Sequence, residues 1–245
     1  MPPGTVYHLF MATVVTVMDR PGWRTNTDNI VVVRPEIKKL LWVPRDLWCE
    51  LLGDRINTAF ARGGHGLLLE SLAEHDLRVD FSLCLSRTAV EDFLSGIEVT
   101  IPIPRKMEYW YPEHPQANLQ DGRKHICFEP PSETLRGERL HQWIGARRAF
   151  KGGGSDLHRI QRQKVLLRRL LEEGFSFHEI LDRPDRFRWT GDEVLDDLAR
   201  VGSGWKFDTL ADVVPRTIEG KMVLVNRRSL PVVGWLRGLR WRRLA

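Results

Sequence analysis

The feature that most constrains the fold is a succession of β-branched segments near the N-terminus. Residues 13–18 have the sequence TVVTVM, and residues 30–33 have the sequence IVVV after a polar loop that contains Gly and Pro. Residues 39–43 (KLLWV) form a third apolar segment. β-Branched runs bounded by turn residues predict buried strands, so the chain is expected to begin with three strands.

The following segments alternate between helical and extended patterns, which indicates a layered α/β fold. The patterns predict helices over residues 67–73, 90–94 and 135–148, and strands over residues 81–85 and 97–103. Residues 104–131 are rich in Pro, Asn, Gly and aromatic residues and show no clear period. They are interpreted as a long surface excursion, and excursions of this length are often functional.

Composition narrows the class of protein. The chain has 245 residues, 42% of them hydrophobic, which is enough for a substantial core. Lys and Arg outnumber Asp and Glu by 37 to 32, and arginine dominates the basic set, which favours recognition of phosphates or carboxylates. The cysteines, Cys49, Cys84 and Cys127, are too widely spaced for a zinc site or a disulfide framework.

No stretch approaches the roughly 20 apolar residues that span a bilayer. Residues 6–18 are too short for this and lack the basic start and cleavage site of a signal peptide. The chain as given is therefore expected to contain neither a transmembrane anchor nor a signal peptide.

Polar side chains that suit an anion gather around a glycine hinge at residues 151–154. After Ser155, a helix N-cap candidate, the pattern predicts a helix with Arg159, Arg162 and Gln163 on one face near its N-terminus. A helix N-terminus attracts anions, and a diphosphate can accept several bidentate arginine pairs at once. The alternative is that these arginines are solvated or paired with surface carboxylates.

Five ordered segments resemble the signature of the LytR–CpsA–Psr family of cell-envelope phosphotransferases. They are residues 43–46 (VPRD), 55–64 (RINTAFARGG), 94–102 (LSGIEVTIP), 135–138 (LRGE, followed by arginines at 147 and 148) and 155–163 (SDLHRIQRQ). The resemblance covers about residues 13–174. It implies one three-layer α/β domain over residues 1–245, with a mixed central sheet flanked by helices and residues 175–245 as a C-terminal extension.

The resemblance also implies a reaction. A glycopolymer of teichoic acid, capsule or arabinogalactan type would move from a polyprenyl pyrophosphate carrier to a hydroxyl of peptidoglycan. This would take place in the bacterial cell envelope, at the outer face of the cytoplasmic membrane. The family binds magnesium through two aspartates, for which Asp19 and Asp28 occupy the matching places.

The resemblance gives two further sets of candidates. The candidate catalytic residues are Arg45, Asp46, Arg147, Arg159, Arg162 and Gln163. The candidate substrate-binding residues are Arg45, Arg147, Arg148, Arg159 and Gln163, with Leu166 and Leu170 as candidates for lining a lipid groove. Asp46 is either a general base or a structural partner of Arg45, and the two leucines are either lining or core residues.

Two departures from the family pattern leave an alternative function open. Gly145 and Asn26 stand where the family commonly has arginines, with Arg24 as a possible substitute. The alternative is a non-catalytic relative that binds polyprenyl phosphates. Nucleic-acid binding would use the basic charge and nine tryptophans, but no reader module is visible, so no nucleic-acid partner is expected.

The C-terminal residues 232–245 interleave Trp235 and Trp241 with arginines. Such a segment predicts contact with an anionic membrane surface. A disordered basic tail is the alternative.

Overall fold

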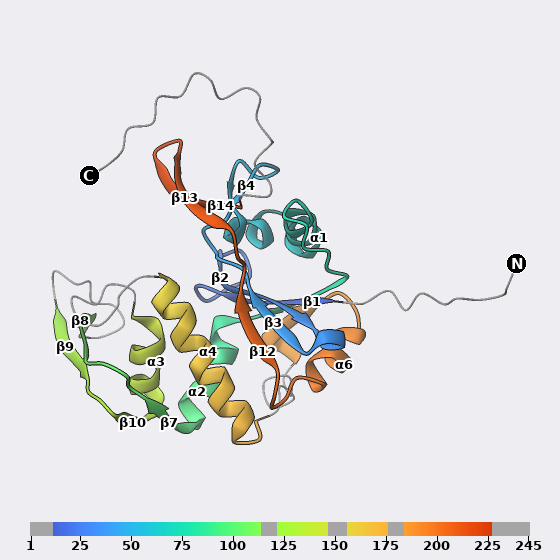
Figure 1. Cartoon of the computed structure of the whole chain (residues 1–245). Coiled ribbons are helices and arrows are strands. Elements are labelled where there is room, and N and C mark those ends of the chain that lie inside the picture. The colour runs from blue at the N-terminus through green and yellow to red at the C-terminus, as the bar shows by residue number, and fades with distance from the viewer. Residues whose placement is uncertain (1–11, 114–121, 147–155, 176–183, 227–245) are drawn as a thin grey trace, which may run out of the picture.

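A computed structural model describes residues 12–113, 122–146, 156–175 and 184–226 of the chain. Figure 1 shows a central sheet with helices on both sides. The helices are α1 (Ala59–Ala73), α2 (Arg87–Gly96), α3 (Gly137–Gly145), α4 (Asp156–Glu172) and α6 (Glu193–Ala199). The strands are β1 (Thr13–Met18), β2 (Thr27–Arg34), β3 (Lys39–Trp42), β4 (Trp48–Cys49), β5 (Asp54–Arg55), β6 (Phe81–Leu85), β7 (Glu98–Pro102), β8 (Met107–Pro112), β9 (Arg123–Phe128), β10 (Ser132–Arg136), β11 (Phe187–Trp189), β12 (Lys206–Thr209), β13 (Val213–Ile218) and β14 (Lys221–Asn226).

The central sheet has six strands in the order β11-β6-β1-β2-β3-β12. β1, β2 and β3 form an antiparallel meander, while β6 runs parallel to β1 and β12 parallel to β3. β11 pairs antiparallel with β6 at the other edge. The sheet is therefore mixed, as expected. Both of its edge strands come from residues 175–245, so this segment completes the sheet.

Helices cover both faces of the sheet because successive residues of a strand point to opposite sides. Val14 of β1 belongs to a buried cluster with Leu68 of α1. Val15, the next residue, belongs to another cluster with Leu171 of α4 and Val194 of α6. Full burial of one such side chain contributes about 1.5–3 kcal/mol. The predicted three layers are confirmed, with α1 on one side and α4 and α6 on the other.

A third buried cluster lies beside the sheet, where α2, α3 and α4 meet two small two-stranded sheets. One pairs β7 with β10 and the other is the hairpin β8–β9, and both are antiparallel. Phe128 of β9, Leu135 of β10 and Leu140 of α3 are fully buried there. Figure 1 shows the hairpin β8–β9 on the left, next to α3. This cluster fixes the position of α4 relative to α3.

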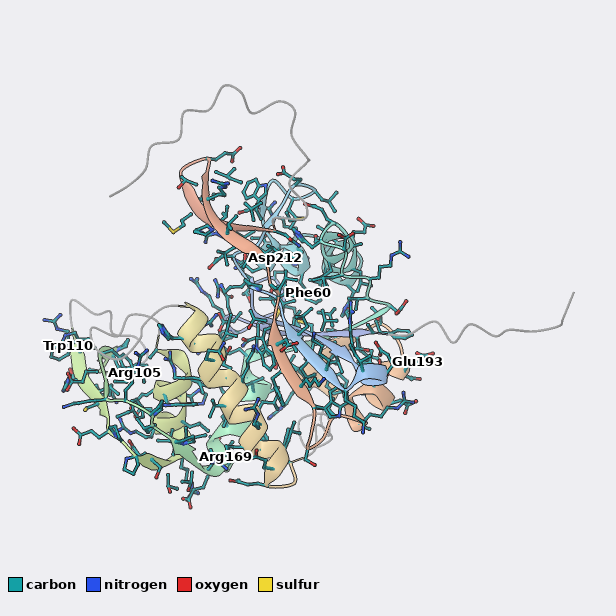
Figure 2. All side chains as sticks on the ribbon, in the orientation of Figure 1. Phe60, Arg105, Trp110, Arg169, Glu193 and Asp212 are labelled. Atoms are coloured by element: carbon teal, nitrogen blue, oxygen red, sulfur yellow. The ribbon has the colours of Figure 1, made fainter. Side chains whose placement is uncertain are left out.

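Residues 104–131, interpreted as a long surface excursion, contain regular structure that the sequence pattern did not indicate. This segment contains β8 and β9, which pair over six registered positions. Tyr109 and Ile126 face inward and are buried, and the Tyr109 hydroxyl donates a hydrogen bond to the carbonyl of Gln142 in α3. Figure 2 labels Trp110 on this hairpin, where 42% of its surface stays exposed.

Helix α1 begins earlier than predicted and contains the glycines expected to precede it. Gly63 and Gly64 have non-helical dihedral angles, so the helix is kinked there. Gly64 has φ 63° and ψ −149°, a conformation that only glycine adopts without strain. α3 is shorter than predicted because Leu135 and Arg136 belong to β10. None of the helices in the described part of the chain is long and apolar enough to cross a membrane.

Candidate active site

The ends of four strands bring polar residues to one end of the sheet, which we call this edge and which is distinct from the outer strands β11 and β12. β1 ends at this edge with Met18, and β6 ends there because it runs parallel to β1. β2 is antiparallel to β1 and therefore begins at this edge. β3 is antiparallel to β2 and therefore ends there. A hydrogen bond of 2.9 Å from the Val43 amide to the Ile30 carbonyl keeps the segment after β3 beside β2. Asp19, Asp28 and Arg45 follow or begin these strands and therefore lie at this edge.

Asp28 occupies an irregularity in the strand pairing. Val17 pairs with Asn29 and Met18 pairs with Thr27, so Asp28 has no partner of its own on β1. A bulge of this kind adds one residue to a strand and redirects its side chain. It allows the Asp28 side chain to face the segment after β3 and helix α4.

Asp28 joins two arginines from distant parts of the chain. Its Oδ1 accepts a hydrogen bond from Nη1 of Arg45, and its Oδ2 accepts one from Nη1 of Arg159. The side chain of Arg159 is only 2% exposed, that of Arg45 13% and that of Asp28 19%. Two guanidinium groups and one carboxylate leave one net positive charge in a largely buried place. We call Arg45, Asp28 and Arg159 the arginine clamp.

Helix α4 supplies Arg159 and, one turn later, Gln163. The Oε1 atom of Gln163 is buried and has no hydrogen-bond partner among the described residues. Arg159 lies in the first turns of a helix of 17 residues, where backbone N–H groups and the helix dipole favour an anion. The structure therefore brings Arg45, Arg159 and Asp28 into contact and places Gln163 next along the same helix.

Arg162 also contacts the end of α3, although the sequence suggested one face for Arg159, Arg162 and Gln163. Its Nη2 donates a hydrogen bond to the carbonyl of Ala146 at the end of α3, and its Nη1 lies 3.5 Å from the Met107 sulfur. Positions i+3 and i+4 diverge by about 100° around a helix, so Arg162 and Gln163 point to different neighbours. Burial lowers the pKa of Arg162 to about 10, and the positive charge of Arg159 adds to this effect. Arg162 stays charged at neutral pH and caps the C-terminus of α3.

Asp46 is not the partner of Arg45, so that interpretation is wrong. Its Oδ1 lies 3.3 Å from Nη1 of Arg55, which follows the tight turn between β4 and β5. The Asp46 carbonyl also accepts a hydrogen bond of 2.9 Å from the amide of Leu224 in β14. Asp46 therefore connects the clamp's neighbourhood to the hairpin β13–β14.

Asp19 has an oxygen atom available for a metal or another donor. Its Oδ1 is buried and makes no hydrogen bond with the residues that the structure describes. Its amide donates to the Asn26 carbonyl at 2.8 Å, and its carbonyl accepts from Nη1 of Arg87 at 2.7 Å. Magnesium uses one or two carboxylates together with waters and substrate phosphates. The available oxygen of Asp19, near Asp28 in the same hairpin, fits this requirement. No group of three or more His, Cys, Asp or Glu that could hold a metal occurs within the described ranges.

The remaining candidates have different positions. Leu166 and Leu170 are buried in the cluster beside the sheet, with Trp143 of α3 as a member of the same cluster. Arg147 and Arg148 lie outside the described residues, as does the tail at residues 232–245. Of the two departures from the family pattern, Gly145 is the last residue of α3 and Asn26 lies at the base of the β1–β2 loop.

Asn57 is a site residue that the sequence interpretation missed. It is 2% exposed, and its Oδ1 has no hydrogen-bond partner among the described residues. Its amide donates to the carbonyl of Arg45 at 3.3 Å, and its carbonyl accepts from Oγ1 of Thr27 at 3.4 Å. Asn57 thereby joins the backbone of Arg45 to the start of β2. The sequence could have indicated Asn57, because it is a polar residue within residues 55–64, a segment that resembles the family pattern.

Comparison with known proteins identifies the family. The model of the LytR_cpsA_psr family matches residues 13–227. The chain belongs to the LytR–CpsA–Psr family. Members of this family are associated with the cell envelope and act in cell-wall glycopolymer transfer, which gives this chain a phosphotransferase-type role at the level of the family. The sequence has no significant match among curated proteins.

Solved structures of low sequence identity share the fold. A structure described as TagT bound to LI-WTA is 16% identical, with a TM-score of 0.62, and the match covers 89% of this chain and 85% of that one. TagV of B. subtilis is 17% identical, with a TM-score of 0.60 and coverage of 89% and 91%. A protein of Streptococcus agalactiae is 15% identical, with a TM-score of 0.64 and coverage of 87% and 81%.

Proposed function

We propose that this protein transfers a glycopolymer from a polyprenyl pyrophosphate carrier to a hydroxyl of peptidoglycan. The observation that carries the proposal is the arginine clamp, in which Arg45 and Arg159 share the single carboxylate of Asp28. Charge-assisted bonds from guanidinium groups suit phosphate oxygens as well as they suit carboxylates. A diphosphate at the clamp would offer several acceptor oxygens to these two guanidinium groups.

Binding in the clamp would orient the reacting phosphorus. The N-terminus of α4 adds its partial positive charge, and Gln163 offers an amide group one turn along the helix. Asn57 helps to fix the position of Arg45, because its amide donates a hydrogen bond to the carbonyl of Arg45. Preorganised donors of this kind stabilise charge that develops in a transition state without reorganising during the reaction.

Magnesium is the cofactor that we propose for this site, with Asp19 and Asp28 as its protein ligands. Asp28 supplies a carboxylate at the clamp, and Asp19 has a buried oxygen without a hydrogen-bond partner among the described residues. When bound, the ion would supply positive charge that offsets the negative charge of the diphosphate.

The transfer would form one bond and break one bond at the sugar-proximal phosphorus. The acceptor hydroxyl gives its proton to solvent while its oxygen would form a new P–O bond, the bond to the bridging oxygen would break, and polyprenyl phosphate would leave with the electron pair. The arginines would stabilise the charge on that leaving phosphate. Asp46 was a candidate for accepting the hydroxyl proton, but its ion pair with Arg55 favours a structural role.

The lipid part of the carrier needs an apolar groove, and residues of the buried cluster beside the sheet are the candidates for lining it. Leu166 and Leu170 follow Arg159 along α4 and lie in this cluster with Trp143. Arg147 and Arg148 remain candidates for substrate binding, and both lie outside the described residues. The TagT structure has LI-WTA as its bound ligand, and the shared fold favours a teichoic-acid-type polymer for this chain as well.

A turnover assay tests this function against the alternative. The alternative is a non-catalytic protein that binds polyprenyl phosphates, and it is favoured by the missing guanidinium groups at Asn26 and Gly145. The protein is incubated with magnesium, a polyprenyl-pyrophosphoryl glycan and peptidoglycan. Released polyprenyl phosphate together with glycan on peptidoglycan supports the transferase. Bound lipid without turnover supports the alternative, and neither binding nor turnover contradicts both.

A variant makes the assay specific for the clamp. Arg159→Lys keeps the positive charge but loses the planar pair of donors, so turnover should decrease strongly. Arg169→Lys, at the other end of α4, is the matched control because Arg169 is exposed and pairs with Glu172 on the same helix. Equal activities of the two variants would remove Arg159 from the proposed site.

A further inference from the structure

The loop between β1 and β2 carries exposed arginines that the clamp does not use. Arg20 and Arg24 are both exposed, and neither forms an ion pair with a carboxylate in the part of the chain that the structure describes. The loop is closed by a hydrogen bond of 3.3 Å from Oγ1 of Thr25 to the carbonyl of Arg20. Gly22, with φ 97°, allows the tight bend between them. The two arginines therefore project from one short, closed loop.

A third arginine reaches this loop from the edge of the sheet. The guanidinium carbon of Arg188, in β11, lies 4.6 Å from the ring centroid of Trp23 in the loop. A cation over an indole face at this distance is attracted by the ring. The other described polar contact of Arg188 is a hydrogen bond of 3.2 Å from its Nη1 to the carbonyl of Phe187. Arg188 is exposed, and no carboxylate of a described residue pairs with it. We call Arg20, Trp23, Arg24 and Arg188 the arginine rim.

Two carboxylates of the neighbouring helix α2 pair with other arginines. Glu91 pairs with Arg87 at 2.6 Å, and Asp92 pairs with Arg186 at 2.6 Å. Arg87 also donates to the carbonyl of Asp19, which ties the base of the loop to the start of α2. The rim thus keeps an excess of positive charge on a loop that its neighbours hold in place.

We propose that the arginine rim binds the anionic, phosphodiester-linked chain of the transferred polymer, outside the clamp that holds the diphosphate. The inference rests on the proposed function for the identity of the polymer. The rim begins one residue after Asp19, at the edge of the sheet where the clamp lies, so a polymer leaving the clamp would meet it. Repeated phosphates along a chain match separate arginines better than one isolated anion does.

The rim suits a soluble polyanion better than a membrane. Insertion into a bilayer surface needs exposed apolar side chains. Between Arg20 and Arg24 the loop offers only Pro21, Gly22 and Trp23, and the indole of Trp23 is half-buried beneath Arg188. The substrate class that follows is a polymer with charged repeats, in preference to a neutral polysaccharide.

The test uses poly(glycerol phosphate) that carries neither lipid nor pyrophosphate, so binding does not depend on the clamp's substrate. Fluorescence anisotropy of the labelled polymer measures its affinity for the full-length protein over a series of salt concentrations. Dextran serves as the neutral polymer. Arg20→Gln/Arg24→Gln/Arg188→Gln should bind about 10-fold or more weakly at low salt. Each lost phosphate contact reduces the slope of log K against log salt by about 0.7, so the slope should fall by roughly 2. Dextran should not bind.

A second triple variant controls for net charge. Arg78→Gln/Arg136→Gln/Arg169→Gln removes three exposed charges at other places on the surface and should retain nearly the full affinity. Equal losses in the two triple variants would mean that binding follows overall charge and would overturn the proposal. It would also be overturned if the rim variant bound poly(glycerol phosphate) normally. If the rim bound single-stranded nucleic acid or phosphatidylglycerol vesicles more tightly than poly(glycerol phosphate), that partner would be its ligand and the proposal would be overturned.

The outcome is separable from that of the proposed function. Arg159→Met should lose polyprenyl pyrophosphate binding and keep poly(glycerol phosphate) binding, and the rim variant Arg20→Gln/Arg188→Gln, which leaves Arg24 in place, should do the reverse. A rim variant that behaves normally while Arg159→Met fails refutes the rim alone. The opposite result refutes the clamp alone.

Discussion

Replacing Asp28 by asparagine tests the charge balance of the arginine clamp. The substitution keeps the shape of the side chain but removes the charge that Arg45 and Arg159 share. Breaking a buried ion pair by removing one partner costs about 3–5 kcal/mol of unfolding free energy. Arg45 and Asp28 retain some solvent access, so we expect Asp28→Asn to lower the unfolding free energy by about 3 kcal/mol.

Replacing an arginine of the clamp should lower the unfolding free energy less than replacing Asp28. Arg159→Met removes one of the two guanidinium groups and leaves the pair of Arg45 with Asp28 in place. Methionine also fills much of the volume of an arginine stem, and apolar replacement of a buried ion can be close to neutral. We expect a loss of about 1–2 kcal/mol. The unfolding free energy of both variants is measured by urea titration followed by circular dichroism.

Inorganic pyrophosphate should restore the stability of Asp28→Asn. The anion replaces the missing carboxylate between Arg45 and Arg159, and a ligand at 100 times its Kd stabilises the native state by about 2.7 kcal/mol. The gain should be larger than in the wild type and should disappear in Asp28→Asn/Arg159→Met. The reasoning is refuted if Asp28→Asn is no less stable than Arg159→Met, or if pyrophosphate stabilises the variant no more than the wild type.

Three further predictions concern the elements around the clamp. Arg162→Met should lower the unfolding free energy by about 1–3 kcal/mol, because the carbonyl at the end of α3 loses its donor; the affinity for pyrophosphate should stay unchanged, and a large decrease would place Arg162 in the phosphate site. Gly64→Ala should destabilise the protein by about 1–3 kcal/mol, since alanine is strained at the dihedral angles of Gly64. Gly66→Ala is its control in the same urea titration and should be neutral or stabilising, because a Cβ there meets no atom within 4 Å. Acidification below pH 6.5 should lower the unfolding free energy, because burial lowers the pKa of His75 below 6.5 in the native state. The unfolded state then takes up a proton that the native state refuses until the lower pKa is reached. The dependence should be weaker in His75→Gln, and an unchanged pH profile in that variant would contradict this cause.

The strands of the central meander could be predicted because their signal is local. Thr13–Met18 is a β-branched run, and both faces of the strand are buried in the structure. The hairpin β8–β9 could not be predicted in the same way. Its inward-facing residues, such as Tyr109, become buried only because α3 and the neighbouring two-stranded sheet cover them. Context of this kind overrides local strand propensity.

The candidate site was predictable where the family pattern specified a residue, and less so where a partner comes from elsewhere in the fold. The pattern selected Arg45, Arg159 and Asp28, which the structure brings together. It did not reveal that Asp28 is shared, because that depends on a bulge in β2. Arg162 was grouped with Gln163 by helical spacing alone, and its contact at the end of α3 became visible only with the packing of the helices.

The partner of Asp46 also depended on tertiary structure. Arg45 was the neighbour suggested by the sequence, but Arg55 approaches from β5 after a tight turn. The same packing explains Asn57, whose backbone bonds to Arg45 and whose side-chain oxygen remains buried. Sequence motifs therefore indicated the residue types, whereas the antiparallel meander and α4 determined their contacts.

The most direct test of the central claim is the affinity of the clamp for a soluble, short-chain polyprenyl pyrophosphate. Isothermal titration calorimetry in the presence of magnesium compares the wild type with Arg159→Met and with the control Arg169→Met. The wild type and Arg169→Met should bind with similar affinity, and Arg159→Met should bind at least about 10-fold more weakly, since it loses charge-assisted bonds to the diphosphate. Equal affinity of Arg159→Met and the wild type, with the folded state of both verified, would contradict the claim that the arginine clamp holds the carrier's diphosphate.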